Sequence, residues 1–99
     1  MKTTKATPIT DGINRRFFIA IEALVSLNRV SALESFCKEA GLSPSRYRET
    51  RLTYGVTPNP NSKPSRYKVV EFEALCSLIN NYGISAEWLL VGRGKMFKQ

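Results

Sequence analysis

The chain has 99 residues, of which 42% are hydrophobic, and this is enough for the core of one small domain without disulfides or metal. Fifteen lysines and arginines stand against 8 aspartates and glutamates, so a net charge of +7 favours polyanionic partners such as nucleic acid or an anionic membrane surface. Histidine is absent and Asp11 is the only aspartate, which excludes histidine-dependent triads and histidine-ligated zinc. We therefore expect no enzyme, no cofactor, no metal site and no small-molecule substrate.

The two cysteines and the absence of long apolar runs indicate the cellular setting. Cys37 and Cys76 form no CxxC pattern, and each lies in an apolar helical stretch, as is typical of core residues in a reduced protein. No run approaches the ~20 apolar residues that span a bilayer, and the N-terminus lacks the apolar run of a signal peptide. We expect a cytoplasmic protein without a membrane partner.

The first twelve residues differ in character from the rest of the chain. Residues 1–12 are polar and contain Pro8, which predicts a flexible N-terminal arm, and residues 13–99 are expected to form a single domain. Asn14 is a candidate cap for a helix that continues to Leu27. Its apolar face would consist of Phe17, Ile21, Leu24 and Val25, widened by Phe18 and Ile19.

Two shorter helices follow. Ser31 and Glu34 have the spacing of a capping box, which predicts a second helix from about Ala32 up to Gly41. Ser43 precedes a proline at a first helical position, so a third helix is expected from Pro44 to about Tyr54.

A long proline-rich segment separates the third helix from the last two. Residues 56–67 contain Pro58, Pro60 and Pro64 and predict a loop that is long for so small a domain. Apolar spacing then predicts a core helix over 68–82, with a stripe made of Phe72, Leu75, Cys76 and Ile79. Ser85 is a suitable cap for a short helix over 86–91. The prediction is an all-α domain of five helices with a long loop after the third.

The second and third helices have the pattern of a helix-turn-helix. Cys37 supplies the small side chain that such a joint needs one turn before the glycine, Gly41 makes the tight turn, and Leu42 would fill the space between the two axes. This geometry directs the third helix outward. By helical spacing, Tyr47 and Thr50 would point toward the core, and the outer face would consist of Ser45, Arg48, Glu49 and Leu52. For Leu52, packing beneath the loop is favoured over contact with a thymine methyl.

The positive charge is concentrated in this region. Between residues 43 and 68 six basic residues accompany the single acid Glu49, so this segment carries +5 of the total +7. Arginine can bind guanine O6 and N7 or phosphate oxygens through its forked donors, and lysine neutralises phosphate. The alternative is a solvated helix face beside a charged loop. Because the positive charge lies on the outer helix of a helix-turn-helix, nucleic-acid binding is favoured over this alternative.

Two segments resemble the lambda-repressor-like, or Xre-type, helix-turn-helix regulators of phages and mobile elements. Residues 36–43 (FCKEAGLS) look like the second helix and turn of that family, and residues 82–96 (YGISAEWLLVGRGKM) are similar to the end of many phage-repressor N-terminal domains. The resemblance covers about residues 14–97 and implies a five-helix domain whose third helix reads the major groove. Cys37 stands where the family usually has alanine and Tyr47 where it has a branched aliphatic residue, and the loop is longer.

Taken together, these features predict a transcription regulator that occupies an operator in double-stranded DNA, as a homodimer at least on DNA. Ser45, Arg48 and Glu49 would face base edges, with Glu49 accepting a hydrogen bond from cytosine N4. Dimerisation would use the apolar end around residues 88–97. The phosphate contacts would come from Ser43, Arg46, Arg51, Lys63, Arg66 and Lys68.

The alternative interpretation is a helical protein–protein interaction module that keeps the fold without binding DNA. It would bind a protein partner through Trp88, Leu90, Val91 and Phe97. This alternative gives no reason for the charge of the third helix.

Overall fold

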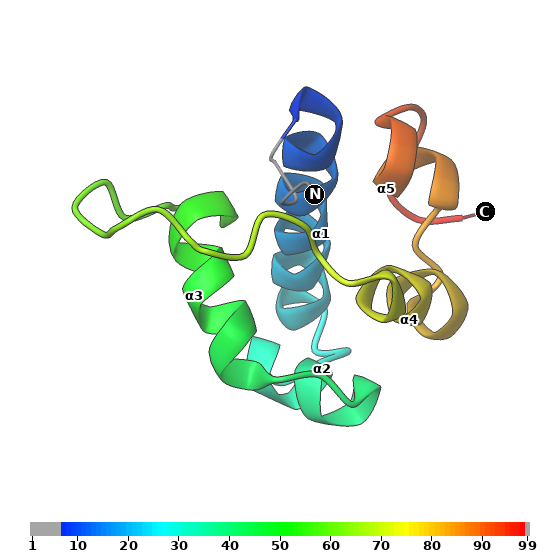
Figure 1. Ribbon diagram of the computed structural model, residues 1–99. Helices are drawn as coiled ribbons and strands as arrows, with labels where there is room; N and C mark the ends of the chain where they lie inside the picture. The colour runs from blue at the N-terminus through cyan, green and yellow to red at the C-terminus, as the bar shows by residue number, and fades with distance from the viewer. Residues whose placement is uncertain (1–6, 99) are drawn as a thin grey trace.

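The computed structural model describes residues 7–98, and within them it has five α-helices and no β-strand beyond one isolated bridge. The expected all-α, five-helix architecture is confirmed. In Figure 1, α1 lies in the middle, with α3 on one side and α5 on the other. The helices are α1 (Pro8–Ser26), α2 (Leu33–Ala40), α3 (Pro44–Tyr54), α4 (Phe72–Tyr82) and α5 (Ala86–Val91). In the described range, no helix has the length and apolarity needed to cross a membrane.

Helix α1 starts seven residues earlier than the sequence predicted, since its cap is Thr7 and not Asn14. Thr7 is its N-cap, because the Thr7 hydroxyl accepts from the Thr10 N–H at 3.1 Å and the Thr10 hydroxyl accepts from the Thr7 N–H at 2.8 Å. Pro8 occupies the first turn, where its missing N–H costs nothing. The predicted flexible arm over 1–12 is therefore wrong for residues 8–12, and residues 1–6 lie outside the described residues.

The core forms around the apolar face of α1. Phe17 is fully buried, and its ring centroid lies 5.8 Å from that of Phe36 in α2 and 5.6 Å from that of Tyr47 in α3. Burial of each such side chain stabilises the fold by about 1.5–3 kcal/mol. The other large buried apolar residues include Phe18, Ile21, Leu24, Leu33, Leu78, Ile84 and Leu89.

Helix α2 lacks the predicted capping box. Ala32 is the N-cap, and no side chain caps the helix, because the Ser31 hydroxyl instead pairs with the Ser35 hydroxyl at 2.6 Å. The Glu34 carboxylate is bound to Arg48 of α3. The predicted box fails because both of its side chains have other partners.

Helix α4 begins at Phe72, not at Lys68, because side chains of other helices bind the preceding backbone. The buried Asn14 amide donates to the Lys68 carbonyl at 2.9 Å and accepts from the Val70 N–H at 3.0 Å. The predicted apolar stripe fails at Phe72, which is 73% exposed, whereas Leu75 is buried and Ile79 packs partly against the core. The buried face of α4 consists of Ala74, Leu75 and Leu78.

Helix α5 has the predicted cap and the predicted bounds. The Ser85 hydroxyl accepts from the Trp88 N–H at 3.3 Å, and Gly92 ends the helix at φ 84°. The chain then turns back, and the Ser85 N–H donates to the Met96 carbonyl at 2.7 Å. This return packs the partly buried Trp88 and Phe97 against the core.

Candidate nucleic-acid interface

The joint between α2 and α3 is built as a helix-turn-helix. Gly41 has φ 74°, a left-handed conformation that favours glycine, and the Leu42 N–H donates to the Cys37 carbonyl at 2.8 Å. Cys37 is completely buried beneath the turn, as predicted, and Leu42 packs partly against the core. Ser43 caps α3 by accepting from the Arg46 N–H at 3.4 Å.

Only one face of α3 is buried. Tyr47, Thr50 and Tyr54 recur at helical spacing and are the buried residues of α3, which confirms the inward orientation predicted for Tyr47 and Thr50. The Tyr47 hydroxyl donates to Glu71 Oε1 at 3.0 Å and accepts from the Glu71 N–H at 3.1 Å. Burial raises the pKa of Tyr47 well above its usual value. These two bonds fix α3 against the segment that precedes α4.

The opposite face of α3 is open to solvent. Ser45, Arg48 and Leu52 are exposed along it, and Glu49 is partly exposed. Arg51 is exposed as well. The structure therefore brings the three predicted base-facing residues, Ser45, Arg48 and Glu49, onto one outward face of one helix.

Two of these three residues already have ionic partners. Arg48 Nη1 lies 2.6 Å from Glu34 Oε2, and both side chains are about half exposed. Both oxygens of Glu49 are occupied by Arg66, whose backbone N–H, Nε and Nη2 donate at 3.2, 3.3 and 3.2 Å. Arg66 therefore lowers the pKa of Glu49. Sequence reasoning gave no sign of either partner, because the partners are 14 and 17 residues apart.

The long loop is fastened to α3 at both of its ends. Near its start, the Asn59 N–H donates to the Leu52 carbonyl at 3.0 Å. Near its end, the buried Ser65 donates its N–H to the Thr53 hydroxyl at 2.8 Å. Figure 1 shows the loop extending beyond α3 on the side away from α1. These two hydrogen bonds hold the loop against α3.

The loop carries its predicted cations in different environments. Lys63 and Arg66 are exposed, whereas Lys68 is partly buried and its carbonyl binds Asn14. A pocket of about 530 Å³ lies between α3 and the loop. Its lining consists of Lys63 and Arg66 together with Glu49, Leu52, Ser62 and Pro64. Leu52 lines this pocket but is 42% exposed.

Arg46 differs from the predicted phosphate contact. Its guanidinium carbon lies 4.5 Å from the centroid of the Tyr67 ring, and its Nη2 donates to the Val69 carbonyl at 3.3 Å. Its Nε is also 3.9 Å from Glu71 Oε1. Arg46 therefore joins α3 to the end of the loop, and the sequence gave no reason to select Tyr67.

The net positive charge of residues 43–68 thus divides into paired and unpaired cations. Among the described residues, Arg46, Arg48 and Arg66 take part in salt bridges, whereas Arg51, Lys63 and Lys68 take part in none. The charges of Arg51, Lys63 and Lys68 are thus not offset by a carboxylate in salt-bridge contact.

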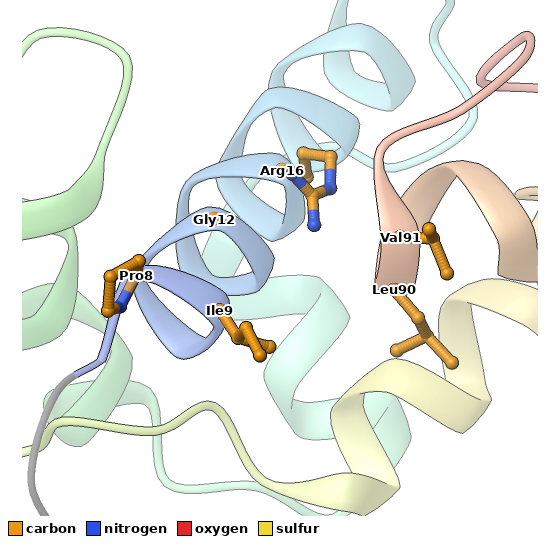
Figure 2. Close-up of a pocket in the computed structure, with 6 residues that line it drawn as sticks. All are labelled: Pro8, Ile9, Gly12, Arg16, Leu90 and Val91. Atoms are coloured by element: carbon orange, nitrogen blue, oxygen red, sulfur yellow. The ribbon is translucent and has the colours of Figure 1, made fainter.

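A second surface lies on the other side of α1. Figure 2 shows Ile9 of α1 facing Leu90 and Val91 of α5 across a pocket of about 450 Å³. Ile9 is 71% exposed and Val91 is 56% exposed. Leu90 and Val91 thus remain exposed, whereas Trp88 and Phe97 are partly buried and pack against the core.

No group of three or more metal-ligating side chains is present in the described part of the chain. Comparison with protein-family models, with curated proteins and with solved structures finds no match to this chain.

Proposed function

We propose that this chain is a sequence-specific DNA-binding transcription regulator of the phage-repressor type, acting in the cytoplasm, whose α3 enters the major groove of double-stranded DNA. One observation carries the proposal: the outer helix of a helix-turn-helix turns an exposed polar face to solvent, in a segment with six cations and one acid. The resemblance of residues 36–43 and 82–96 to the lambda-repressor-like family supports the same conclusion.

In this proposal, Ser45 and Arg48 contact base edges. The ion pair between Arg48 and Glu34 does not prevent this, because an exposed pair contributes only about 0.2–1 kcal/mol. A bidentate contact of arginine with guanine contributes about 1–3 kcal/mol to discrimination. When Arg48 leaves Glu34 and binds a guanine of the correct sequence, the net change in free energy is therefore favourable.

The phosphate contacts come from the flanks of α3. Ser43 and the Ser45 N–H form an anion site at the start of the 11-residue α3, since Pro44 has no N–H and the Arg46 N–H is bound by Ser43. Arg51 and Lys63 add unpaired charge beside its outer face. Regulation then follows from occupancy of the operator.

We further propose that two copies bind together on DNA. A domain of this size makes few base contacts, and helix-turn-helix proteins commonly read two half-sites about 34 Å apart as a symmetric dimer. The exposed Leu90 and Val91 belong to α5, which lies across α1 from α3 (Figure 1), so a second copy bound there leaves α3 uncovered.

The same apolar surface favours the second candidate function, a protein–protein interaction module. A different protein would then occupy the surface formed by Ile9, Leu90 and Val91. The two candidates differ in what they require of α3, because only DNA binding gives a role to its cations.

Selection from random duplexes with the purified chain tests the proposal. We expect an enriched motif with dyad symmetry, and an affinity for it that falls with salt. Lys63→Ala should lower the slope of log affinity against log salt by about one, and Lys95→Ala, a cation distant in sequence, should leave it unchanged. The absence of an enriched motif, with only weak salt-dependent binding to every duplex, would favour the interaction module.

A further inference from the structure

The contact between Glu49 and Arg66 gives each residue a role different from the one its sequence suggests. Three N–H groups of Arg66 donate to the two oxygens of Glu49. A carboxylate held in this way has little remaining capacity to accept from cytosine N4. Glu49 is thus a poor base reader in this structure.

The guanidinium of Arg66 keeps a free edge. Arginine has five N–H donors on its guanidinium, and Glu49 takes one from Nε and one from Nη2. Both donors of Nη1 and the second donor of Nη2 remain, and the Arg66 side chain is 76% exposed. This free edge is the fork that matches a planar pair of acceptors.

Other contacts restrict where Arg66 can lie. The preceding residue, Ser65, is buried and bound to Thr53 of α3. The Tyr67 ring follows, with the Arg66 guanidinium carbon 5.2 Å from its centroid and that of Arg46 4.5 Å from it. The backbone, an aromatic ring and a carboxylate therefore all hold Arg66 beside the outer face of α3.

We propose that Arg66 is a specificity-determining residue that binds guanine O6 and N7 beside the site of α3, and that Glu49 is the positioning residue that orients it. This rests on the proposed function. Phosphate binding needs charge but little orientation, as for the neighbouring Lys63, whereas a base edge requires the fork to be aligned with it. The three donors on Glu49 supply that alignment.

The proposal predicts that removing the negative charge of Glu49 weakens binding to the preferred site, although removing an acid near DNA would ordinarily strengthen binding. A carboxylate on a surface that faces DNA repels phosphate, so loss of the charge alone should strengthen binding to every duplex. If Glu49 orients Arg66, Glu49→Gln should instead weaken binding to the preferred site, because the amide keeps one acceptor and loses the charge that holds the guanidinium.

The experiment uses the full chain, the duplex that it selects and a scrambled duplex of equal length. Glu49→Gln, Arg66→Lys and the double variant are compared with Glu22→Gln, which removes an exposed acid from α1. We expect each single variant to lose about five- to 100-fold in affinity for the selected duplex and the double variant to lose no more than either. Binding to the scrambled duplex should change by less than about twofold, and Glu22→Gln should have no effect on discrimination. Melting temperatures exclude a folding defect.

Three results would overturn the inference. If Glu49→Gln bound the selected duplex as tightly as the wild type or more tightly, the repulsion between Glu49 and phosphate would outweigh any orientation of Arg66. Equal weakening on both duplexes would make Arg66 a phosphate contact. If the affinity losses of Glu49→Gln and Arg66→Lys added up in the double variant, the two residues would act independently of each other. A wild-type chain that selects no motif would overturn the proposed function itself, which is a distinct result.

Discussion

At the scale of single residues, two buried polar side chains determine how the helices meet. Asn14 uses both ends of its amide on the backbone of residues 68 and 70. Tyr47 uses its hydroxyl both as donor and as acceptor on Glu71. Each side chain binds backbone groups that precede α4, and the helix begins only at Phe72, after the extended Glu71.

Asn14→Ala should lower the free energy of unfolding by about 1–3 kcal/mol. The substitution leaves the buried Val70 N–H without its partner, and an unpaired buried donor carries this cost. Urea denaturation measures the effect, and Asn80→Ala, on the exposed side of α4, should change stability by less than about 0.5 kcal/mol. Equal stability of the two variants would mean that the amide does not hold the segment.

The buried Cys37 thiol makes the fold sensitive to alkali. Burial raises the pKa of this thiol from 9.0 to about 11. The unfolded chain therefore releases its proton at lower pH than the folded protein, so stability falls as pH rises from about 9 to about 11. The thermal midpoint of the wild type should decrease more between about pH 8 and about pH 10 than that of Cys37→Ala. Parallel decreases in the two proteins would contradict this source of the pH dependence.

At the scale of helices, boundaries marked by a local glycine or serine signal were the most predictable. Glycine and serine signals act within a few residues, and Gly41, Ser43 and Ser85 have the roles that the sequence predicted. The Thr7–Thr10 box is equally local, but the polar composition of residues 1–12 gives no sign of a helix there. The start of α4 was not predictable, because Asn14 lies 54 residues from the carbonyl that it binds.

The α2–α3 joint should resist enlargement at Cys37. Leucine at this fully buried position overpacks the contact between the two helices, and we expect a loss of about 1–3 kcal/mol. Cys76→Leu is the matched control, because Cys76 is only partly buried in α4 and should cost less. A Cys37→Leu protein with an unchanged thermal midpoint would contradict the tight packing of the joint.

At the scale of the whole molecule, the sequence predicted the segment that carries the charge but not how its charges are paired. The outward face of α3 followed from helical spacing alone. The partners of Arg48 and Glu49 come from α2 and from the loop, and such contacts between elements have no local sequence signal. The folded protein thus pairs Arg46, Arg48 and Arg66 with carboxylates and leaves Arg51, Lys63 and Lys68 without a salt bridge.

Assembly should depend on the apolar surface between α1 and α5. Leu90→Glu puts a charge on this exposed surface without entering the core, so the fold should remain intact. We expect the wild type to bind its selected duplex as two chains and Leu90→Glu to bind one half-site weakly, as measured by sedimentation. Glu87→Gln is a control on the same helix. Two bound copies of Leu90→Glu would place the dimer contact elsewhere.

The most direct test of the central claim is the affinity of Arg48→Ala for the selected and the scrambled duplex. Arg93→Ala removes an equal charge from an exposed position after α5 and serves as the control. If α3 reads the major groove, Arg48→Ala loses about 1–3 kcal/mol on the selected duplex, little on the scrambled one, and specificity relaxes at one base pair. Equal losses on both duplexes, or the same behaviour in Arg93→Ala, would contradict the assignment of α3 as the reading helix.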